Sequence, residues 1–245
     1  MTRTFSLIGP GRAGQSVSSA LVSVGWVLES TYDVSDDVTK AAADVDLLIV
    51  ATPDFAIRDV AAAIEPARAV LLHLSGATSL DALSPHRAAG MHPLVSLSDP
   101  TVGASALRNA WFAVAGDPLA SQIAESLSGK WFEIEDRNRA LYHGAAAIGA
   151  NHLVALLGQV ERIGAEIGVP LEAFMSLVKS SIENVEASGP AAALTGPAAR
   201  GDEVTIERHR SALADRLPDE LEAYDAMLAL ARGLAQQQSA DPTGA

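Results

Sequence analysis

Two kinds of hydrophobic pattern alternate through the first 135 residues of the chain. Apolar runs such as DLLIVATPD and AVLLHLSG are too short for helices, and their continuous apolarity is typical of parallel strands covered on both faces. Between such runs, apolar residues recur at helical spacing, as in the segment that ends at Gly25 and in a short alanine-rich stretch before Asp46. This alternation predicts an α/β fold, a doubly wound parallel sheet that extends to about residue 135.

The second half of the chain shows helical periodicity alone. The predicted helices cover residues 139–167, 171–187 and 219–235. Glycines and prolines in ALTGPAARGDE (193–203) exclude a long helix there. We therefore predict an α/β domain over residues 1–135 and an all-α domain over residues 136–245, with residues 236–245 as a disordered tail.

Composition and charge exclude several classes of function. The formal charge of −13 and the scattered 17 Lys and Arg argue against a nucleic-acid partner. The absence of cysteine removes disulfides, thiolate nucleophiles and cysteine-ligated zinc. The six histidines show no metal-ligand spacing such as HExxH, and no G-x-S-x-G elbow of a serine hydrolase is present. We expect no metal.

No targeting or membrane segment is evident in the pattern. The most apolar segment, residues 140–160, carries Tyr, two His, Asn and Gln, which disfavours a membrane span of about 20 apolar residues. We expect a cytoplasmic protein without a membrane partner.

The motif GPGRAG (residues 9–14) carries the first chemical signal. Gly9 would permit a tight turn, Gly11 would let the backbone approach a pyrophosphate, and Gly14 would let the helix pack closely on the strand. The N–H groups at the start of the following helix favour an anion. Because the motif follows a strand and opens a helix, it predicts a dinucleotide-binding site of the Rossmann type. The residues predicted to bind the cofactor here are Gly9, Pro10, Gly11, Arg12 and Gly14.

Asp33 lies 19 positions after Gly14, at the predicted end of the second strand. A carboxylate at this place accepts hydrogen bonds from the ribose hydroxyls of NAD and repels the 2′-phosphate of NADP, so the cofactor is NAD or NADP with a preference for NAD. Two alternatives stay open: Arg12 reaches a phosphate, or Asp33 is a solvated turn residue.

The stretch YHGAAAIGANH (142–152) joins small residues to polar ones on the long predicted helix. The small residues would let another backbone or a ligand come close. His143 and Asn151 lie two turns apart and roughly 80° apart around the axis, so both would project toward one cleft. His143 would then either donate a proton or hold the domain interface, and Asn151 would either orient a substrate or bond a neighbouring helix.

Several motifs together resemble a known family. GPGRAG, ATPD (51–54), HLSG (73–76) and MHPL (91–94), with LYH…AN (141–151) and ALTGPAARGD (193–202), resemble the uncharacterised Rossmann-like oxidoreductases of the 6-phosphogluconate-dehydrogenase-like superfamily, which carry a C-terminal helical domain of unknown function. The resemblance implies a nicotinamide-dependent reductase or dehydrogenase. It also implies a homodimer formed through the helical domain and a small-molecule substrate held in the interdomain cleft.

The resemblance also implies roles for single residues. Thr52, Pro53 and Asp54 would end the third strand beside the cofactor, and Ser75 would lie near the nicotinamide. His92 resembles the His-Pro histidine of prephenate dehydrogenases, and the alternative is a rigid strand exit.

From the helical domain, Thr195, Arg200 and Asp202 would bind the substrate. Arg200 would clamp a carboxylate, unless it pairs with Asp202 to fix the loop.

One departure shapes the predicted mechanism. Several members of the superfamily carry a catalytic lysine on the long helix, whereas Lys40, Lys130 and Lys179 lie elsewhere. Proton transfer would then fall to His143, with Asn151 orienting a small carboxylate-bearing carbonyl or imine substrate. The competing hypotheses are a non-catalytic dinucleotide-binding sensor or regulatory module, and a Rossmann-like methyltransferase.

Overall fold

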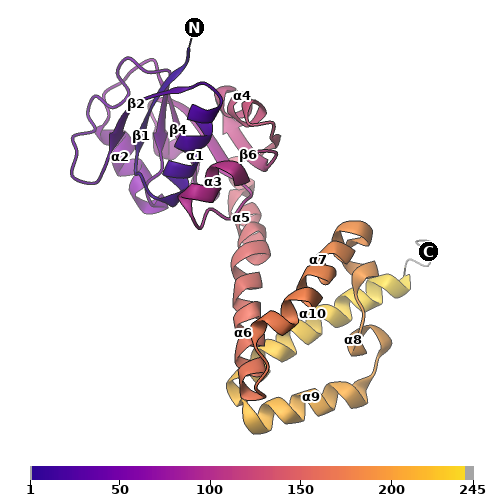
Figure 1. The fold of residues 1–245 in the computed structure, drawn as a ribbon. Coiled ribbons are helices and arrows are strands. Elements are labelled where there is room, and N and C mark those ends of the chain that lie inside the picture. The colour runs from indigo at the N-terminus through magenta and orange to yellow at the C-terminus, as the bar shows by residue number, and fades with distance from the viewer. Residues whose placement is uncertain (1, 241–245) are drawn as a thin grey trace. The chain divides into compact units, whose positions relative to one another are not determined.

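The computed structural model of the chain describes residues 2–240. The chain divides into two compact units, Met1–Asn151 and His152–Ala245. Figure 1 shows the first as a sheet with helices around it and the second as a set of helices. The predicted α/β domain followed by an all-α region is confirmed.

The first unit contains a seven-stranded sheet in the order β2-β1-β3-β4-β5-β6-β7. Its strands are β1 (Thr4–Ile8), β2 (Val27–Tyr32), β3 (Leu47–Val50), β4 (Val70–His73), β5 (Arg87–Pro93), β6 (Trp111–Gly116) and β7 (Lys130–Glu133). Every neighbouring pair is parallel except β5 and β6, which run antiparallel. The sheet reaches residue 133, as predicted, but one of its pairings is not parallel.

Helices cover both faces of this sheet. They are α1 (Arg12–Ser23), α2 (Ile57–Ala63), α3 (Pro100–Ala106) and α4 (Leu119–Ser126), with 3₁₀ turns η1 (Asp54–Ala56), η2 (Leu80–Leu83) and η3 (Asp136–Asn138). One apolar cluster joins alternate strand residues to α1 and α4, and the other joins the opposite face to α2 and η2. All four residues of β3 and of β4 are buried, which explains their continuous apolarity.

In the first unit, the end of α1 agrees with the sequence prediction, whereas the alanine-rich segment before β3 does not. Gly25 has a φ of +94° directly after the end of α1, as expected of the glycine that closes a helix. The alanine-rich segment before β3 is a series of turns rather than the predicted helix, and Asp44 there has a φ of 58°. Its Ala41 and Ala42 are buried against Ile8, Leu48 and other apolar residues, so packing and not helicity explains the alanines.

A long helical segment follows the sheet. It consists of α5 (Arg139–Ala147), a π-helical turn η4 (Ile148–His152) and α6 (Leu153–Glu166). The predicted helix from Arg139 to about Ile167 is therefore present, but its regular 3.6-residue repeat is broken within IGANH. Because a π turn holds more residues than an α turn, the 80° estimate between His143 and Asn151 does not hold.

By length and composition alone, the segment Asp136–Glu166 could cross a membrane, which the sequence analysis did not expect. Its first turns, however, are bound to the sheet through the buried Arg139 and through Tyr142, whose hydroxyl bonds His92.

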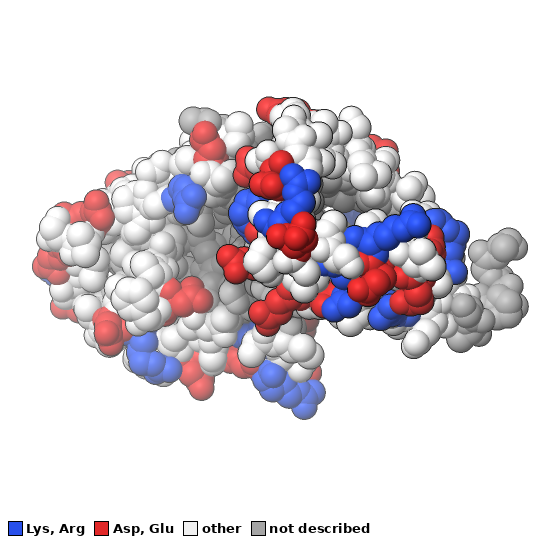
Figure 2. Space-filling view, turned by 90° about the horizontal axis from the view of Figure 1, so that it is seen from below, with Lys and Arg blue, Asp and Glu red and all other residues white. Residues whose placement is uncertain are grey.

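The second unit is held by ion pairs between helices. Its further helices are α7 (Leu171–Ala193), α8 (Pro197–Arg200), α9 (Glu203–Arg216), η5 (Pro218–Glu220) and α10 (Leu221–Ala240). Arg210 on α9 donates from Nε and Nη2 to the two carboxylate oxygens of Asp225 on α10, at 2.8 and 3.0 Å. Arg162 on α6 pairs with Glu220. On the face in Figure 2, acidic and basic side chains are intermixed, as such pairs require.

Boundaries in the second half differ from those predicted in two places and agree in one. The compact units divide after Asn151, whereas the sequence placed the boundary between residues 135 and 136, where the last strand has ended. The helix over Leu171–Ala193 is kinked at Gly189, whose φ of 80° agrees with the predicted end near Ser188–Gly189–Pro190. The helix α10 continues to Ala240, beyond the predicted helix end at residue 235. Residues 241–245 lie outside the described part of the chain.

Candidate functional site

The glycine turn after β1 is shaped as a dinucleotide cradle requires. Gly9 has a φ of +87°, and a Cβ there would lie 2.7 Å from the Ala51 carbonyl oxygen. A Cβ at Gly14 would collide with the Gly9 carbonyl oxygen, so α1 packs on β1 at backbone distance. Gly11, the N-cap of α1, faces open space: a Cβ there would meet nothing within 4 Å. Packing within the chain therefore does not require a glycine at position 11. The missing side chain leaves room for a group from outside the chain.

The strand order places this turn where open α/β sheets bind ligands. β1 lies between β2 and β3, so the order of connection reverses at β1 and opens a crevice at the carboxyl ends of β1 and β3. Thr52 follows β3 beside Gly9: its backbone nitrogen would lie 3.1 Å from a Gly9 Cβ. Its Oγ1 is buried, yet it has no hydrogen-bond partner among the described residues. An unpaired buried hydroxyl at this edge fits a bound polar group.

Asp33 directly follows β2, where Tyr32 accepts a hydrogen bond from the Gly9 nitrogen at 3.0 Å. Its carboxylate is exposed and accepts from the Val34 nitrogen at 2.7 Å. Asp36 caps the same turn by accepting from the Asp33 nitrogen. Asp33 therefore stands at the strand end next to the glycine turn, as predicted. Pro10 and Arg12 lie in that turn, with the Arg12 side chain exposed.

Asp54 and Ser75 are brought together from the ends of β3 and β4. The Ser75 hydroxyl donates to Asp54 Oδ2 at 2.7 Å and accepts from the backbone nitrogens of Ala77 and Thr78 at 3.2 and 2.9 Å. Pro53 precedes Asp54, and its carbonyl accepts from the Ala56 nitrogen in the η1 turn. Ser75 is thus mainly committed to its own loop, while the Asp54 carboxylate stays exposed.

Two histidines and a tyrosine meet at the ends of β4 and β5. His92 Nδ1 lies 2.6 Å from the Tyr142 hydroxyl, and the His92 and His143 rings stand edge to face with centroids 5.8 Å apart. Gly76 forms the floor, because a Cβ there would lie 2.8 Å from His143 Cδ2 and 3.1 Å from two His92 ring atoms. Both rings can therefore pack only on a glycine.

Burial shifts the pKa values of His92 and Tyr142 away from their ordinary values. Desolvation lowers the pKa of His92 to about 4, and His143 beside it acts in the same direction. The imidazole is consequently neutral near pH 7, so its Nδ1 can accept the proton of Tyr142. Burial raises the pKa of Tyr142 to about 12, which keeps that hydroxyl protonated. The pair is a neutral hydroxyl donor bonded to a neutral imidazole.

The predicted residues of the long helix do not behave alike. His143 lies against Gly76 and His92, whereas Asn151 is exposed within the π turn. Thr195, Arg200 and Asp202 belong to the second unit. Their roles toward a substrate remain predictions.

Local contacts account for two of these second-unit residues. Thr195 is exposed before Gly196. Asp202 caps α9: its carboxylate accepts from the Thr205 nitrogen at 3.0 Å and from the Thr205 hydroxyl at 2.7 Å. These bonds to Thr205 lower the pKa of Asp202, and the nearby Arg200 contributes in the same direction. Arg200 itself is exposed at the end of α8.

Three residues of the site were missed by sequence reasoning. Tyr142 is the hydrogen-bond partner of His92. His73 and Arg139 are 0 % and 2 % exposed, and both lie against the Gly90 position. The signals were present: His73 ends the continuous strand VLLH, and Arg139 precedes Tyr142 by one turn on the same face of a helix. Across the described residues, no three His, Asp or Glu side chains gather as metal ligands.

Comparison with known proteins agrees with this architecture. Residues 112–231 match the family described as "Domain of unknown function (DUF2520)". That region begins at Phe112, within the sheet, and ends within α10. No curated protein matches the sequence of this chain.

Solved structures share the whole fold. Protein TM1727 from Thermotoga maritima has 23% sequence identity and a TM-score of 0.75 over 96% of this chain and 99% of that chain. Protein BF3122 from Bacteroides fragilis has 18% identity and a TM-score of 0.75, over 95% and 98% of the two chains. A reductive aminase from Aspergillus terreus, in complex with NADPH4, cyclohexanone and allyl amine, has 17% identity and a TM-score of 0.64, over 100% and 96%. The fold is the Rossmann type with a helical second part.

Proposed function

We propose that this protein is an NAD(P)-dependent oxidoreductase that reduces or oxidises a small carboxylate-bearing carbonyl or imine compound. The observation that carries the proposal is Gly11: it stands at the N-terminus of α1, at the switch point of the sheet, with open space where a side chain would be. The unpaired Thr52 hydroxyl beside it adds a polar group without a partner in the described chain. The reductive aminase of similar fold, in its complex with NADPH4, supports this choice of cofactor.

The residues that would hold the dinucleotide are those of the glycine turn, with Asp33 toward the ribose and Thr52–Asp54 beside the nicotinamide half. When bound, a nicotinamide supplies or accepts a hydride. The chain's own part would be to orient the substrate and to move a proton at the carbonyl oxygen or imine nitrogen. The cluster of His92, Tyr142 and His143 lies at the carboxyl ends of the neighbouring strands and offers the groups for that step.

His143 is our first choice as the proton donor, with Asn151, Thr195, Arg200 and Asp202 as further substrate ligands. His143 lies against Gly76 with a partly exposed side chain, and imidazole is a suitable group for donating a proton to a substrate. The substrate class rests on Arg200, whose planar fork suits a carboxylate. If His143→Ala left kcat unchanged with a turned-over substrate, this assignment would be wrong.

We propose NAD as the preferred cofactor. Asp33 presents an exposed carboxylate at the end of β2, and Asp36 and Asp37 follow within the same turn. A 2′-phosphate would meet this negative charge without a guanidinium in the turn to balance it. Asp33→Asn should therefore raise the affinity for NADPH relative to that for NADH, and an unchanged ratio would argue against the preference.

We further propose a homodimer formed through the helical part of the chain. Exposed apolar side chains recur there, among them Leu177, Leu230 and Met227, which are 66%, 64% and 44% exposed. Exposed apolar side chains in such number are typical of a surface that another chain covers. We expect these residues to be covered by a second copy in a cytoplasmic protein.

Titration calorimetry with NADH and with NADPH tests the cofactor part. We expect saturable binding to the wild-type chain and its loss in Gly11→Val, while Gly233→Val, at a position of α10 where a Cβ also meets no atom within 4 Å, serves as the control. Absence of binding by either cofactor at millimolar concentration would overturn the proposal. Oxidation of the bound cofactor against a panel of keto acids, with and without ammonia, then separates an oxidoreductase from a sensor: binding without turnover across the panel would favour the sensor.

A further inference from the structure

Arg139 is a buried charged side chain that has no role in the proposed reaction. It is 2 % exposed at the first residue of α5. A buried guanidinium is costly unless it is paired and hydrogen-bonded. Its Nη2 has no hydrogen-bond partner among the described residues and would lie 2.9 Å from a Cβ placed on Gly90, so it is pressed against β5. Such a cost calls for a compensating role.

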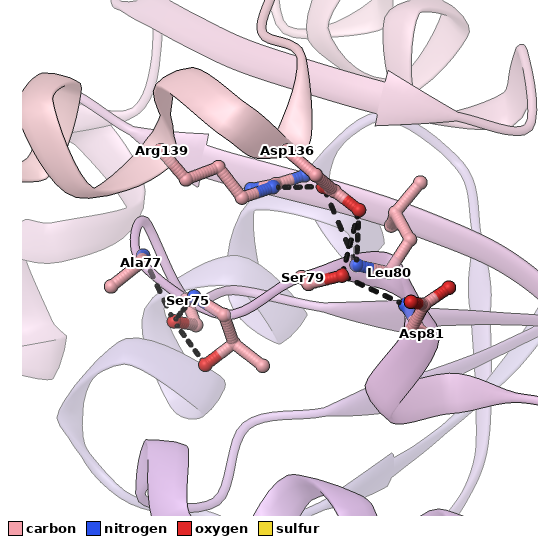
Figure 3. Close-up of polar contacts among 8 residues, drawn as sticks. Ser75, Ala77, Ser79, Leu80, Asp81, Asp136 and Arg139 are labelled. Carbon is pink, nitrogen blue, oxygen red and sulfur yellow. Dashed lines mark hydrogen bonds and ion pairs between the residues drawn. The ribbon is translucent and has the colours of Figure 1, made fainter.

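Asp136 connects Arg139 to the loop that follows β4. Arg139 Nε donates to Asp136 Oδ1 at 2.6 Å. The other oxygen, Oδ2, accepts from the Ser79 hydroxyl at 2.7 Å and from the Leu80 nitrogen at 3.2 Å. Figure 3 shows this chain of contacts, with Asp136 between Arg139 and the start of η2. The first turn of α5 is thereby tied to the strand end that also carries Gly76.

Tyr142 and His143 stand three and four residues after Arg139, which places all three on one face of α5. One turn of helix separates the anchor from the His92–Tyr142 bond and from the contact of His143 with Gly76. Any rotation or lift of the first turn would move both side chains relative to His92.

We propose that Arg139 is the positioning residue of this site: its ion pair with Asp136 fixes the first turn of α5 and so sets where Tyr142 and His143 lie against His92 and Gly76. The meaning for catalysis rests on the proposed function, whereas the geometric claim does not. Arg139 touches no proposed reacting atom and acts through the helix.

Charge gives a second way to observe the same anchor. His73 also lies against the Gly90 position, with Cε1 3.1 Å from a Cβ there, and both of its ring nitrogens lack partners among the described residues. Burial lowers the pKa of His73 to about 4, and the charge of Arg139 acts in the same direction, while Asp54 and Asp136 oppose it. The pKa of His92 is lowered mainly by burial. The neighbouring His143 and Arg139 lower it further, and Asp54 raises it. Both rings therefore report on the position of Arg139.

The test is nuclear magnetic resonance of the full chain, wild type against Arg139→Gln. We expect the variant to lose the ring contact between Tyr142 and His92, and the titration of His73 to move upward by roughly one pH unit because a nearby positive charge is gone. Arg137→Gln is the matched control, since that arginine lies two residues away with a side chain 78% exposed in a pair with Glu135. The control should leave contact and titration unchanged.

An Arg139→Gln chain that keeps the Tyr142–His92 contact of the wild type would overturn the proposal, even where the His73 titration moves, because the lost charge alone moves that titration. Arg139→Lys is the conservative variant, because it retains the positive charge. It should restore the His73 titration more fully than the Tyr142–His92 contact, because an ammonium cannot reproduce the reach and geometry of the guanidinium.

If Arg139→Gln does not fold, Ser79→Ala and Asp136→Asn decide. Each removes part of the link to the η2 loop, and each should weaken the Tyr142–His92 contact; an unchanged contact in both would overturn the proposal.

The cofactor titration stays separate from this test. A wild-type chain that binds neither NADH nor NADPH removes the proposed function but leaves the resonance experiment and its outcome intact. We expect Arg139→Gln to bind NADH within about twofold of wild type, since the glycine turn and Asp33 lie on other strands of the sheet.

Discussion

The two compact units bury their side chains in different ways. The first unit encloses whole strands, such as β3 and β4, between layers of helices. In the second, Ile206 and Leu213 are the buried apolar side chains among the described residues, and the helices are joined by arginine–carboxylate pairs such as Arg210–Asp225. The first unit is therefore stabilised mainly by its own apolar core, whereas the second keeps apolar side chains such as Leu177 and Leu230 exposed.

Truncating one leucine in each unit should give the largest difference in the free energy of unfolding. Leu72→Ala, at a fully buried position of β4, should lower the free energy of unfolding by about 2–5 kcal/mol. Leu177→Ala, at an exposed position of α7, should change it by less than about 0.5 kcal/mol in the dissociated chain. Urea unfolding followed by far-ultraviolet circular dichroism measures both variants, because both units contain helices. Tryptophan fluorescence follows the first unit separately, since Trp26, Trp111 and Trp131 all lie there. Equal losses in the two variants would contradict the comparison.

Acid should destabilise the first unit through His73. Its folded pKa of about 4 lies below the ordinary 6.5, so the unfolded chain binds the proton more readily, and stability falls as the pH drops from about 6.5 to about 4. The full loss from this one group is on the order of 3 kcal/mol. His73→Gln should flatten that part of the stability profile, measured by urea unfolding at stepped pH. His152→Gln, at an exposed position, is the control, and an equally steep profile in His73→Gln would exclude this source.

The glycine turn offers a test of packing against binding within one motif. Gly14→Ala places a Cβ against the Gly9 carbonyl and should destabilise the first unit by about 1–3 kcal/mol. Gly11→Val meets no atom of the chain within 4 Å of its Cβ, so the unfolding midpoint should stay near that of wild type. Its affinity for NADH should fall at least about tenfold, as seen by calorimetry. A Gly11→Val chain that binds NADH normally would show that the open space is not the cofactor cradle.

The smallest effect on the single chain, and the sharpest on assembly, is expected from Leu177→Asp. A charge on the exposed apolar face should dissociate the proposed homodimer, because desolvating a carboxylate in an apolar interface is costly. Light scattering at several concentrations measures the mass. Lys179→Asp places the same carboxylate on the opposite side of α7 and should keep the dimer. A monomeric wild type would leave the second unit without the proposed partner.

Much of the proposed cofactor site could be predicted from the sequence because its signals are local. A glycine with positive φ, a helix start and an acidic residue after the next strand lie within 25 residues, from Gly9 to Asp33. The cluster of His92, Tyr142 and His143 was only partly anticipated from the sequence. His92 and His143 were chosen, but the hydroxyl that bonds His92 comes from Tyr142, fifty positions away in the chain, and no spacing rule connects them.

The sequence alone determined the alternation of strands and helices, the glycine turn and the change to helices after residue 135, because hydrophobic period and backbone freedom act over a few residues. Tertiary structure decided the antiparallel direction of β6, the π turn at IGANH and the burial of Arg139 against Gly90. Those features depend on which distant surfaces meet: a guanidinium becomes a buried anchor only when Asp136, Gly90 and the loop after β4 close around it.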